Sequence, residues 1–429
     1  MSGNTIVIGS GPAGLAAALS LSRLRLHPLI LERLDRPALK LSASGGGRCN
    51  FSNVLEPEDF MRKFGREGFF MRDALRSASR EFLLEFLHSE GIEPVIADGF
   101  HYFPASGRAR DLADAFLRAS GAEVRTRSEV SAIETADGGV SGVTLKTGDF
   151  IPAGTVILAA GGCAWEGLGT SAGLKLARLL GHTIRKPLPA VAPLIVQDTW
   201  VGTLAGVTLP DARLTLRAGR RTLSTEGSLL FTHTGFSGFP ALDLAGEVSS
   251  LCDKNGQAEL ILQICADKEP EFWKQLLDSS RQKAGQRSIR AILNEFMPRS
   301  LTEVLTEQCG CAGTKAANLP AESLRRLTEK LSGWKLTLTG AGPMEKAMVM
   351  RGGVSLKEVD PETLSSRLIR GLYFAGEILD LAGPCGGYNM QWAFSSGFLA
   401  GRSAGEWFLN LIRKGNDHEG INRKNFEAQ

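Results

Sequence analysis

The chain has 429 residues, of which 22% are charged and 43% hydrophobic, and its formal net charge is +3 at pH 7. This composition is typical of a globular protein, and the length exceeds that of one ordinary hydrophobic core, so we expect two or three domains. The net charge is small, and the chain contains no block of Lys or Arg. Both observations argue against a nucleic-acid partner.

Cysteine usage and hydropathy indicate the cellular compartment. The seven cysteines are odd in number and scattered, which favours reduced thiols over a disulfide framework. Cys309 and Cys311 have no partner pair at a metal-ligand spacing, so we expect no metal site. The apolar stretch 5–21 is interrupted by glycines and a proline and lacks the basic residues that open a signal peptide. We therefore expect a cytoplasmic protein with no membrane contact.

The first predicted elements make a βαβ unit, with strands at 5–9 and 29–32 and a helix at 11–23. The turn before the helix has the G-x-G-x-x-G spacing of a dinucleotide-binding turn. In such a turn the pyrophosphate lies on the helix N-terminus, where unpaired N–H groups attract it. We assign the residues of this turn to the cofactor: Gly9, Gly11, Pro12, Ala13 and Gly14.

An acidic residue ends the second strand. Glu32 stands where a carboxylate accepts hydrogen bonds from ribose hydroxyls, and an acid at this point disfavours a 2′-phosphate. We assign Glu32 and its neighbour Arg33 to the same nucleotide.

The region 37–53 is loop-like and contains three consecutive glycines, beside which a flat ring or a phosphate can lie. We expect Arg48 to pair with the pyrophosphate and Asn50 to donate to a flavin carbonyl. Arg48 would also lower the pKa of the Cys49 thiol, which makes redox reactivity there a further hypothesis. A flexible surface loop is the alternative. The residues assigned to the cofactor are Gly46, Gly47, Arg48, Cys49 and Asn50.

Further elements follow in the order of an α/β domain. Helical patterns occupy 68–89, 110–120 and 171–180, and strand or meander patterns occupy 124–133, 140–146 and 150–151. A buried strand at 156–160 ends at a tight turn, whose Gly161 and Gly162 we assign to the cofactor.

Composition changes at residue 187, where short alternating strands with Gly and Pro turns begin and continue to about 264. A helical pattern covers 268–331, and a strand returns at 335–339. His233, in a glycine-bearing turn of this β-rich insert, is the histidine best placed for catalysis, with a structural histidine as the alternative. The predicted domains are a cofactor domain (1–187 and 345–412), a β-rich domain (188–266 and 333–344), a helical subdomain (267–332) and a fraying polar tail (413–429).

A second cofactor-type segment lies near the C-terminus. A buried strand at 372–375 runs into acidic residues and a glycine-rich turn, and a helical pattern follows at 388–409. The positive end of that helix would stabilise an anionic reduced flavin, so the two ends of the chain together indicate FAD. An ordinary strand–loop–helix corner is the alternative. We assign Gly376, Glu377, Asp380, Gly387, Tyr388 and Asn389 to the cofactor, with Tyr388 also a catalytic candidate beside His233.

These motifs together resemble the BaiN/RdsA-like family of FAD-dependent oxidoreductases, also called the aminoacetone oxidase family. The resemblance spans nearly the whole chain and rests on 9–14, 44–53, 161–162, 229–238, 351–354 and 372–392. The motifs SGGGRCN and GPxGGYNxQW, in the second and the last of these segments, are together highly specific. It implies an α/β fold in which a Rossmann-type FAD-binding domain of the glutathione-reductase-like class is interrupted by a β-barrel-like domain and a small helical domain. It also implies that Lys40 and the backbone of Val130 contact the cofactor. Two departures are Ala38-Leu39, where Gly-Arg often precedes the lysine, and Cys385, where threonine is usual.

The sequence therefore predicts an FAD-dependent oxidoreductase that transfers a hydride through flavin N5, with a small-molecule substrate between the FAD and β-rich domains. No second complete G-x-G-x-x-G follows a strand, so any NAD(P)H would visit only transiently. Several alternatives stay open: an oxidase or dehydrogenase of a small amine or amino-ketone, an NAD(P)H-driven reductase of an activated C=C bond, a flavin-containing RNA-associated factor and an NAD-only dehydrogenase. The oligomeric state is open as well.

Overall fold

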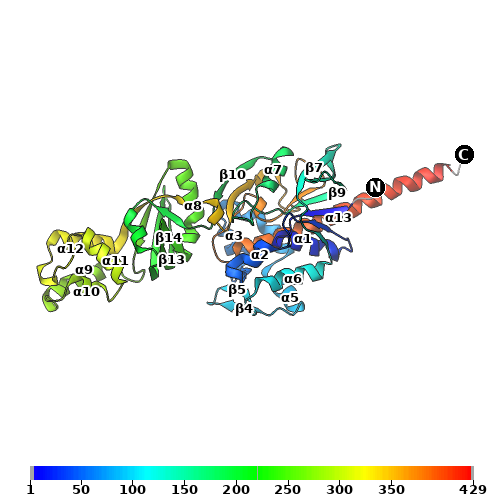
Figure 1. The fold of residues 1–429 in the computed structure, drawn as a ribbon. Helices are drawn as coiled ribbons and strands as arrows, with labels where there is room; N and C mark the ends of the chain where they lie inside the picture. The colour runs from blue at the N-terminus through cyan, green and yellow to red at the C-terminus, as the bar shows by residue number, and fades with distance from the viewer. Residues whose placement is uncertain (1–3, 220, 427–429) are drawn as a thin grey trace. The chain divides into compact units, whose positions relative to one another are not determined.

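The computed structural model describes residues 4–219 and 221–426, and of 414–426 only the backbone. The chain forms two compact units (Figure 1). The first combines Met1–Pro187 with Val349–Gln429, and the second is Leu188–Met348.

A seven-stranded sheet organises the first unit, in the order β6-β2-β1-β9-β8-β7 with β18 also paired to β9. Its parallel strands are β1 (Asn4–Ile8), β2 (Leu29–Leu31), β6 (Glu123–Arg125), the end of β9 (Phe150–Leu158) and β18 (Leu372–Phe374). The beginning of β9 pairs instead with an antiparallel meander, β7 (Val130–Ala136) and β8 (Gly139–Leu145). The segments predicted at 150–151 and 156–160 are therefore one long strand, because the same strand serves both halves of the sheet.

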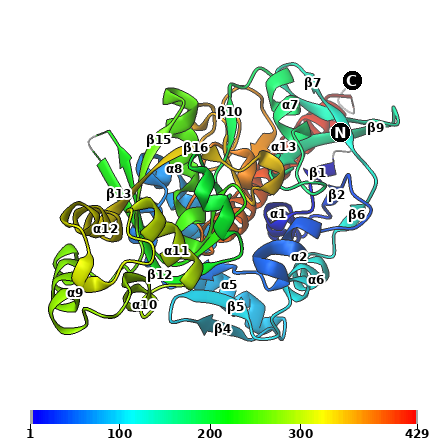
Figure 2. The ribbon, with the colours of Figure 1, turned by 60° about the vertical axis from the view of Figure 1, so that its left-hand side comes forward.

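The parallel strands form the core of this unit. Ile6, Val7, Ile157 and Leu158 are fully buried, as expected for strands covered on both faces. The main helices are α1 (Pro12–Arg23), which packs against both α6 (Ala109–Ser120) and α13 (Tyr388–Phe426), and α7 (Ala172–Leu179), which packs against β7. Figures 1 and 2 both show α1 beside α13, although the chain between them is long.

Glycines bring α13 unusually close to α1. A Cβ on Gly397 would lie 2.0 Å from the carbonyl oxygen of Ala13, and one on Gly401 would lie 2.4 Å from that of Ala17. Gly405, one turn further along, faces the side-chain ends of leucines instead. The four-residue spacing places these glycines on one face of α13, so the two helix backbones touch there.

Short elements complete the first unit and correct two sequence predictions. The region 37–53, expected to be a loop, contains α2 (Leu39–Ala43) and a 3₁₀ turn. The helix predicted at 68–89 is broken into a 3₁₀ segment, α4 (Arg72–Ser77) and α5 (Arg80–Ser89), because Ser79 caps α5 by accepting from the N–H of Phe82 at 3.3 Å. The other elements are α3 (Pro57–Arg62), a small sheet of β3 (Ser52–Asn53), β5 (His101–Pro104) and β4 (Pro94–Ala97), and the pair β10 (Ile184–Pro189) and β17 (Met350–Val354).

The second unit is a closed barrel with helices added. The barrel strands are β11 (Leu194–Val196), β14 (Gly235–Gly238), β13 (Arg221–Thr232), β12 (Thr208–Ala218), β15 (Ala258–Gln263) and β16 (Trp334–Ala341). Alternate residues such as Leu214, Leu216, Leu260 and Leu262 are fully buried. The expectation of strands up to 264 is wrong for α8 (Phe239–Asn255), a helix that packs against β12, β13 and β16.

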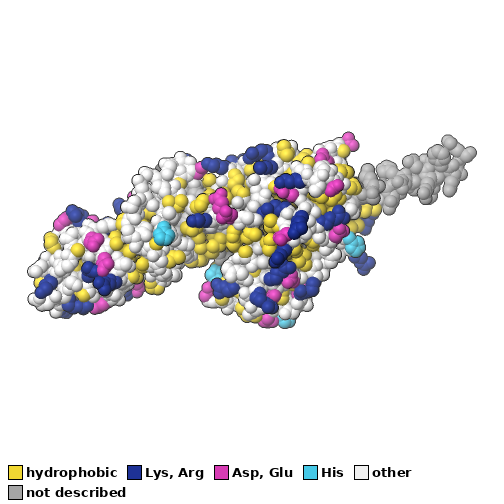
Figure 3. Space-filling view, viewed as in Figure 1, with side chains coloured by type: hydrophobic (Ala, Val, Ile, Leu, Met, Phe, Trp, Pro, Cys, Tyr) yellow, Lys and Arg dark blue, Asp and Glu magenta, His cyan; other side chains and the backbone are white. Residues whose placement is uncertain are grey.

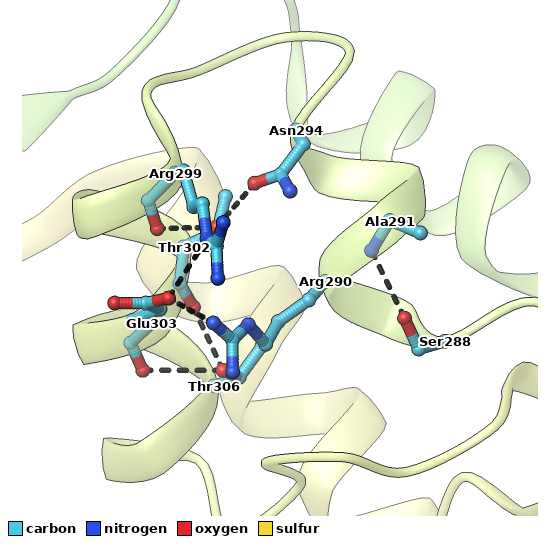
Figure 4. Close-up of polar contacts among 8 residues, drawn as sticks. All are labelled: Ser288, Arg290, Ala291, Asn294, Arg299, Thr302, Glu303 and Thr306. Carbon is cyan, nitrogen blue, oxygen red and sulfur yellow. Dashed lines mark hydrogen bonds and ion pairs between the residues drawn. The ribbon is translucent and has the colours of Figure 1, made fainter.

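The helical subdomain lies between β15 and β16 in sequence and contains α9 (Pro270–Lys283), α10 (Ile289–Leu293), α11 (Arg299–Gln308) and α12 (Ala321–Gly333). Polar contacts join α10 to α11 (Figure 4): Glu303 accepts from Arg290 and Arg299, and the Thr302 hydroxyl lies 2.5 Å from the Asn294 side chain. The predicted α/β class, with a Rossmann-type domain interrupted by a barrel and a helical region, is thereby confirmed.

The C-terminal helix differs from its prediction. α13 continues to Phe426, so the segment 413–426 extends the helix where a fraying tail was expected, and 427–429 lie outside the described residues. Within 4–219 and 221–426, no helix combines the length and the apolar character that crossing a membrane requires.

We expect Gly397→Ala to destabilise the protein more than Gly405→Ala. The first Cβ would collide with the α1 backbone, and such overpacking costs about 1–3 kcal/mol, more than the roughly 1 kcal/mol that alanine gains in helix propensity. The second Cβ meets only leucine side-chain ends, which can move. Thermal unfolding should show a melting temperature lower by roughly 2–6 °C for Gly397→Ala, and unchanged or slightly higher for Gly405→Ala, where the gain in helix propensity meets no backbone collision. Equal melting temperatures would contradict the close helix contact.

Candidate functional site

The ends of four parallel strands bring the predicted cofactor residues together. Gly9 follows β1, Glu32 follows β2, Gly161 lies shortly beyond β9, and Gly376 lies shortly beyond β18. Because these strands are parallel and adjacent, their carboxyl ends share one edge of the sheet. Ligands of open α/β sheets bind at this edge.

Glycine stands at the three positions of the first turn for different physical reasons. Gly9 has a φ of +101°, which a side chain rarely adopts, and a Cβ on Gly14 would lie 1.9 Å from the Gly9 carbonyl oxygen. Gly11 has an ordinary φ of −68°, and a Cβ there would meet no protein atom within 4 Å. The protein itself therefore requires Gly9 and Gly14, whereas its own atoms do not require Gly11. A cofactor lying against the turn at Gly11 stays a prediction.

The N-terminus of α1 lies directly after this turn, at the carboxyl edge of the sheet. No side chain caps it, its first turn has no acidic residue, and Pro12 begins it. The first N–H groups of a helix lack intrahelical partners, so this end with its positive dipole is suited to a pyrophosphate. Pro12 and Ala13 lie at this helix end, and their contact with the cofactor stays a prediction.

Hydrogen bonds from Ser10 and Leu34 hold the Glu32 carboxylate in place. Its Oε2 accepts from the N–H of Ser10 at 3.0 Å and from the Ser10 hydroxyl at 2.6 Å, and its Oε1 accepts from the N–H of Leu34 at 2.9 Å. The residue is 8% exposed. A carboxylate has about four acceptor positions, so Glu32 keeps capacity for ribose hydroxyls while its direction is fixed.

The basic residues Arg33 and Lys40 have protein partners. Arg33 donates to the carbonyl oxygens of Leu168 and Gly169 at 2.8 and 3.0 Å, which fastens the loop after β9. Lys40 forms an ion pair with Glu377, with Nζ and Oε2 2.6 Å apart. Both side chains lie at the carboxyl edge of the sheet, as predicted, but their polar contacts in the structure are with protein atoms of neighbouring loops.

Glu377 and Asp380 also join loops. Besides Lys40, Glu377 accepts from the N–H of Met350 at 2.9 Å and from that of Gly162 at 3.3 Å. Asp380 accepts from the N–H of Gly352 at 3.0 Å. Burial raises the pKa of Asp380, although the Gly352 bond and nearby guanidinium groups work against this. The carboxylates therefore fasten β17 and the end of β9 to the segment after β18.

The glycine loop 44–50 has open space at Gly46, and it corrects the expectation of a reactive Cys49. Gly46 has a φ of +66°, and a Cβ there would meet no protein atom within 4 Å, while Gly47 has a φ of +85°. Arg48 is exposed and lies 5.1 Å from the ring centre of Phe103. Cys49, by contrast, is fully buried, and burial raises the pKa of its thiol to about 12. The hypothesis of a redox-active thiolate at Cys49 is therefore wrong, because desolvation outweighs any effect of Arg48.

Three asparagines hold the turn 383–387 in front of α13. Asn389 donates to the carbonyl oxygens of Gly383 and Pro384 and accepts from the N–H of Gly383. Asn53 donates to the carbonyl oxygen of Gly386 at 2.8 Å.

The third asparagine, Asn50, lies against the same turn. With its amide nitrogen directed at the carbonyl oxygens of Ser52 and Tyr102, Asn50 accepts from the N–H of Gly387 at 3.2 Å. The sequence pattern did not single out Asn53, since a buried asparagine in a two-residue strand has no periodic signal.

The remaining predicted residues are more dispersed. Tyr388 is buried against Phe60 and Phe64, with ring centres 5.0 and 6.1 Å away, which favours a packing role. Val130 begins β7 and is buried, and its adenine contact stays a prediction. His233 is exposed on the turn between β13 and β14 and belongs to the second unit, so it is not among the residues that the first unit brings together.

We predict that Gly11→Val weakens FAD binding at least tenfold, about 1.4 kcal/mol, and leaves the apoprotein folded. The added side chain would fill the space beside the α1 N-terminus and touch no protein atom through its Cβ. Gly14→Ala, in which the new Cβ strikes the backbone of Gly9, should instead lower the melting temperature of the apoprotein. FAD titration followed by fluorescence and circular dichroism of the apoproteins measure the two effects. Unchanged FAD affinity in Gly11→Val would contradict the assignment of this turn.

Curated relatives match almost the whole chain. It is 31% identical over 412 residues to the 3-dehydro-bile acid delta(4,6)-reductase of Clostridium scindens, a match that covers 93% of this chain and 98% of the relative. It is 28% identical over 406 residues to the ribosomal RNA dihydrouridine synthase of Haemophilus influenzae, covering 93% of this chain and 97% of the relative.

Solved structures share the fold at lower identity. The 3-ketosteroid delta1-dehydrogenase of Sterolibacterium denitrificans, solved with 1,4-androstadiene-3,17-dione, superposes with a TM-score of 0.52 at 13% identity. The superposition covers 94% of this chain and 99% of that one.

A family model decides the assignment. The model described as the HI0933-like protein Rossmann domain matches residues 3–403, which include the strand ends, the α1 turn and the beginning of α13. The chain therefore belongs to the HI0933-like Rossmann family and is an FAD-dependent oxidoreductase.

Proposed function

We propose that this enzyme is a reductase that saturates a C=C bond conjugated to a carbonyl group in a small molecule, with NAD(P)H as the source of electrons. The observation that carries the proposal is the chemistry that two relatives share over 93% of the chain. One reduces delta(4,6) bonds of a 3-dehydro bile acid, and the other forms dihydrouridine. Both names describe the saturation of a C=C bond that lies in conjugation with a carbonyl.

The first unit has the residues to hold the cofactor that this chemistry needs. The pyrophosphate would lie on the N-terminus of α1 beside Gly11, and a ribose would lie at Glu32. When bound, FAD supplies a hydride at N5. The loop contacts of Glu377 and Asp380, which fix the backbone at the sheet edge, support a defined position for the cofactor.

The N-terminus of α13 suits a flavin that carries negative charge when reduced. The helix starts at Tyr388 directly after the turn 383–387, and its first turn contains no acidic residue. Its positive dipole end therefore meets no opposing side chain there, which favours the anionic reduced flavin. Hydrogen bonds between the turn and the side chains of Asn53 and Asn389 hold its backbone in one conformation in front of the helix.

A nicotinamide would reduce the flavin from the substrate side. The α1 turn is a complete dinucleotide fingerprint, and Gly340 and Gly342 form only a fragment of another. We infer that NAD(P)H and the substrate use the same face in turn. The seven cysteines are thiols that take part in no disulfide within residues 4–219 and 221–426, which supports the cytoplasm as the location.

The distribution of surface charge favours a small molecule over ribosomal RNA as the substrate. Many basic side chains are paired with acids, for example Arg213 with Glu226 and Arg325 with Glu322 and Glu329. Figure 3 shows basic and acidic side chains intermixed over the visible face. Nucleic-acid binding draws on unpaired cations that displace counterions from phosphates, and pairing reduces that gain. The relative from Haemophilus influenzae makes RNA the second candidate.

The test of the proposal separates the two half-reactions. We expect anaerobic NADH or NADPH to bleach the flavin, and 2-cyclohexen-1-one, as a simple conjugated enone, to restore the oxidised spectrum. Stopped-flow absorbance at the flavin band measures both rates. A flavin that NAD(P)H does not reduce, but that small amines or amino-ketones do, would contradict the reductase and support an oxidase.

The choice between substrates requires a separate comparison. Reduced enzyme mixed with ribosomal RNA should keep its reduced flavin spectrum, and its retention on RNA should vanish at moderate salt, because the net charge is only +3 and basic and acidic side chains are intermixed. Reoxidation by ribosomal RNA together with no reaction with enones would overturn the small-molecule proposal. Yeast transfer RNA provides the control for nonspecific binding.

A further inference from the structure

A histidine–aspartate pair lies in the hairpin between β4 and β5. Nδ1 of His101 lies 2.9 and 3.0 Å from the two carboxylate oxygens of Asp98. Asp98 also accepts from the N–H groups of Phe100 and His101, and its own φ is +52°. The backbone of the hairpin thus fixes the carboxylate, and the carboxylate fixes the imidazole ring.

The other ring nitrogen of His101 faces the turn in front of α13. A Cβ placed on Gly386 would lie 3.1 Å from Nε2 of His101, so glycine is what lets the ring approach. His101 pairs with Asn53 across β5 and β3, and Asn53 donates to the carbonyl oxygen of Gly386. Two residues at the same register of one small sheet therefore contact the same glycine.

Burial and charge distinguish the two members of the pair. The His101 side chain is 18% exposed, whereas that of Asp98 is 61% exposed. Although desolvation works in the other direction, the hydrogen bonds from His101 hold the pKa of Asp98 below its ordinary value. Asp98 is therefore an anion in contact with solvent, and it orients Nδ1–H toward itself and Nε2 toward the turn.

We propose that His101 is the proton donor of the reaction and that Asp98 is its positioning residue. This inference rests on the proposed reductase. Hydride addition to the β-carbon of the enone brings two electrons, oxidises the reduced flavin and leaves an enolate. The Nε2–H bond of the imidazolium then breaks, its proton forms the new C–H bond at the α-carbon, and the neutral ring regains a proton from solvent.

The inference predicts a separation of the half-reactions in His101→Gln. Flavin reduction by NAD(P)H needs no proton from this residue and should stay within about twofold of the wild-type rate. Reoxidation by 2-cyclohexen-1-one should slow by about 10²–10⁴-fold, the usual contribution of a positioned acid. Asp98→Asn, which keeps the histidine, should slow reoxidation by a smaller factor.

A matched control and a spectroscopic measurement exclude a merely structural effect. His88 also pairs with a carboxylate, Glu93, but its side chain is 76% exposed, so His88→Gln should change neither half-reaction. The ¹⁵N spectrum of the oxidised holoprotein should show the Nδ1-protonated form of His101, identified by its loss in His101→Gln. Asp98→Asn should remove the preference for that form. FAD content and melting temperature of each variant report on folding.

The outcomes distinguish this inference from the function on which it rests. If wild-type enzyme is reoxidised by the enone and folded His101→Gln is reoxidised equally fast, the proton-donor assignment is overturned and the reductase stands. A neutral ring protonated on Nε2 alone in the wild-type spectrum would overturn the role of Asp98. If NAD(P)H-reduced wild-type enzyme reacts with no conjugated enone, both the reductase and the proton donor are overturned.

Discussion

The close packing of α1 between β1 and α13 is the constraint on which the site depends. Gly14 allows the helix to touch the turn after β1, and Gly397 and Gly401 allow α13 to touch the helix from another side. With larger residues at these positions α1 would be displaced, and its uncapped N-terminus would no longer stand at the carboxyl edge of the sheet. The position at which the protein can attract a pyrophosphate is thus set by backbone contacts and only secondarily by charged side chains.

Most of the polar side chains at this edge bind protein atoms. Glu377 joins Lys40, Gly162 and Met350, and Asp380 and Asn389 fasten neighbouring segments in the same way. These contacts connect loops that are distant in sequence, so protein atoms alone can hold the site in one arrangement. A preorganised site loses less free energy on binding and keeps the reacting groups in one geometry.

The sequence predicted the parts of the fold whose signals are local. The first βαβ unit has continuous apolar strands and a fixed glycine spacing, and the strand before Gly376 is a continuous apolar run as well, so these elements and the α/β class with its inserted barrel are confirmed. α8 was missed because Pro240, Gly246 and several serines resemble the turns of the surrounding strands. Contacts such as Asn53 and His101 with Gly386 could not be predicted, because they depend on two segments meeting across most of the chain.

The central claim is that one unit of this FAD-dependent oxidoreductase carries the complete cradle of the cofactor. The most direct measurement is a crystal structure of the oxidised holoprotein. We predict the pyrophosphate within hydrogen-bonding distance of the first N–H groups of α1, a ribose on Glu32 and the flavin ring against the turn 383–387, on the side of His101. Density for the flavin ring away from that turn, or for the pyrophosphate away from Gly11, would contradict the claim.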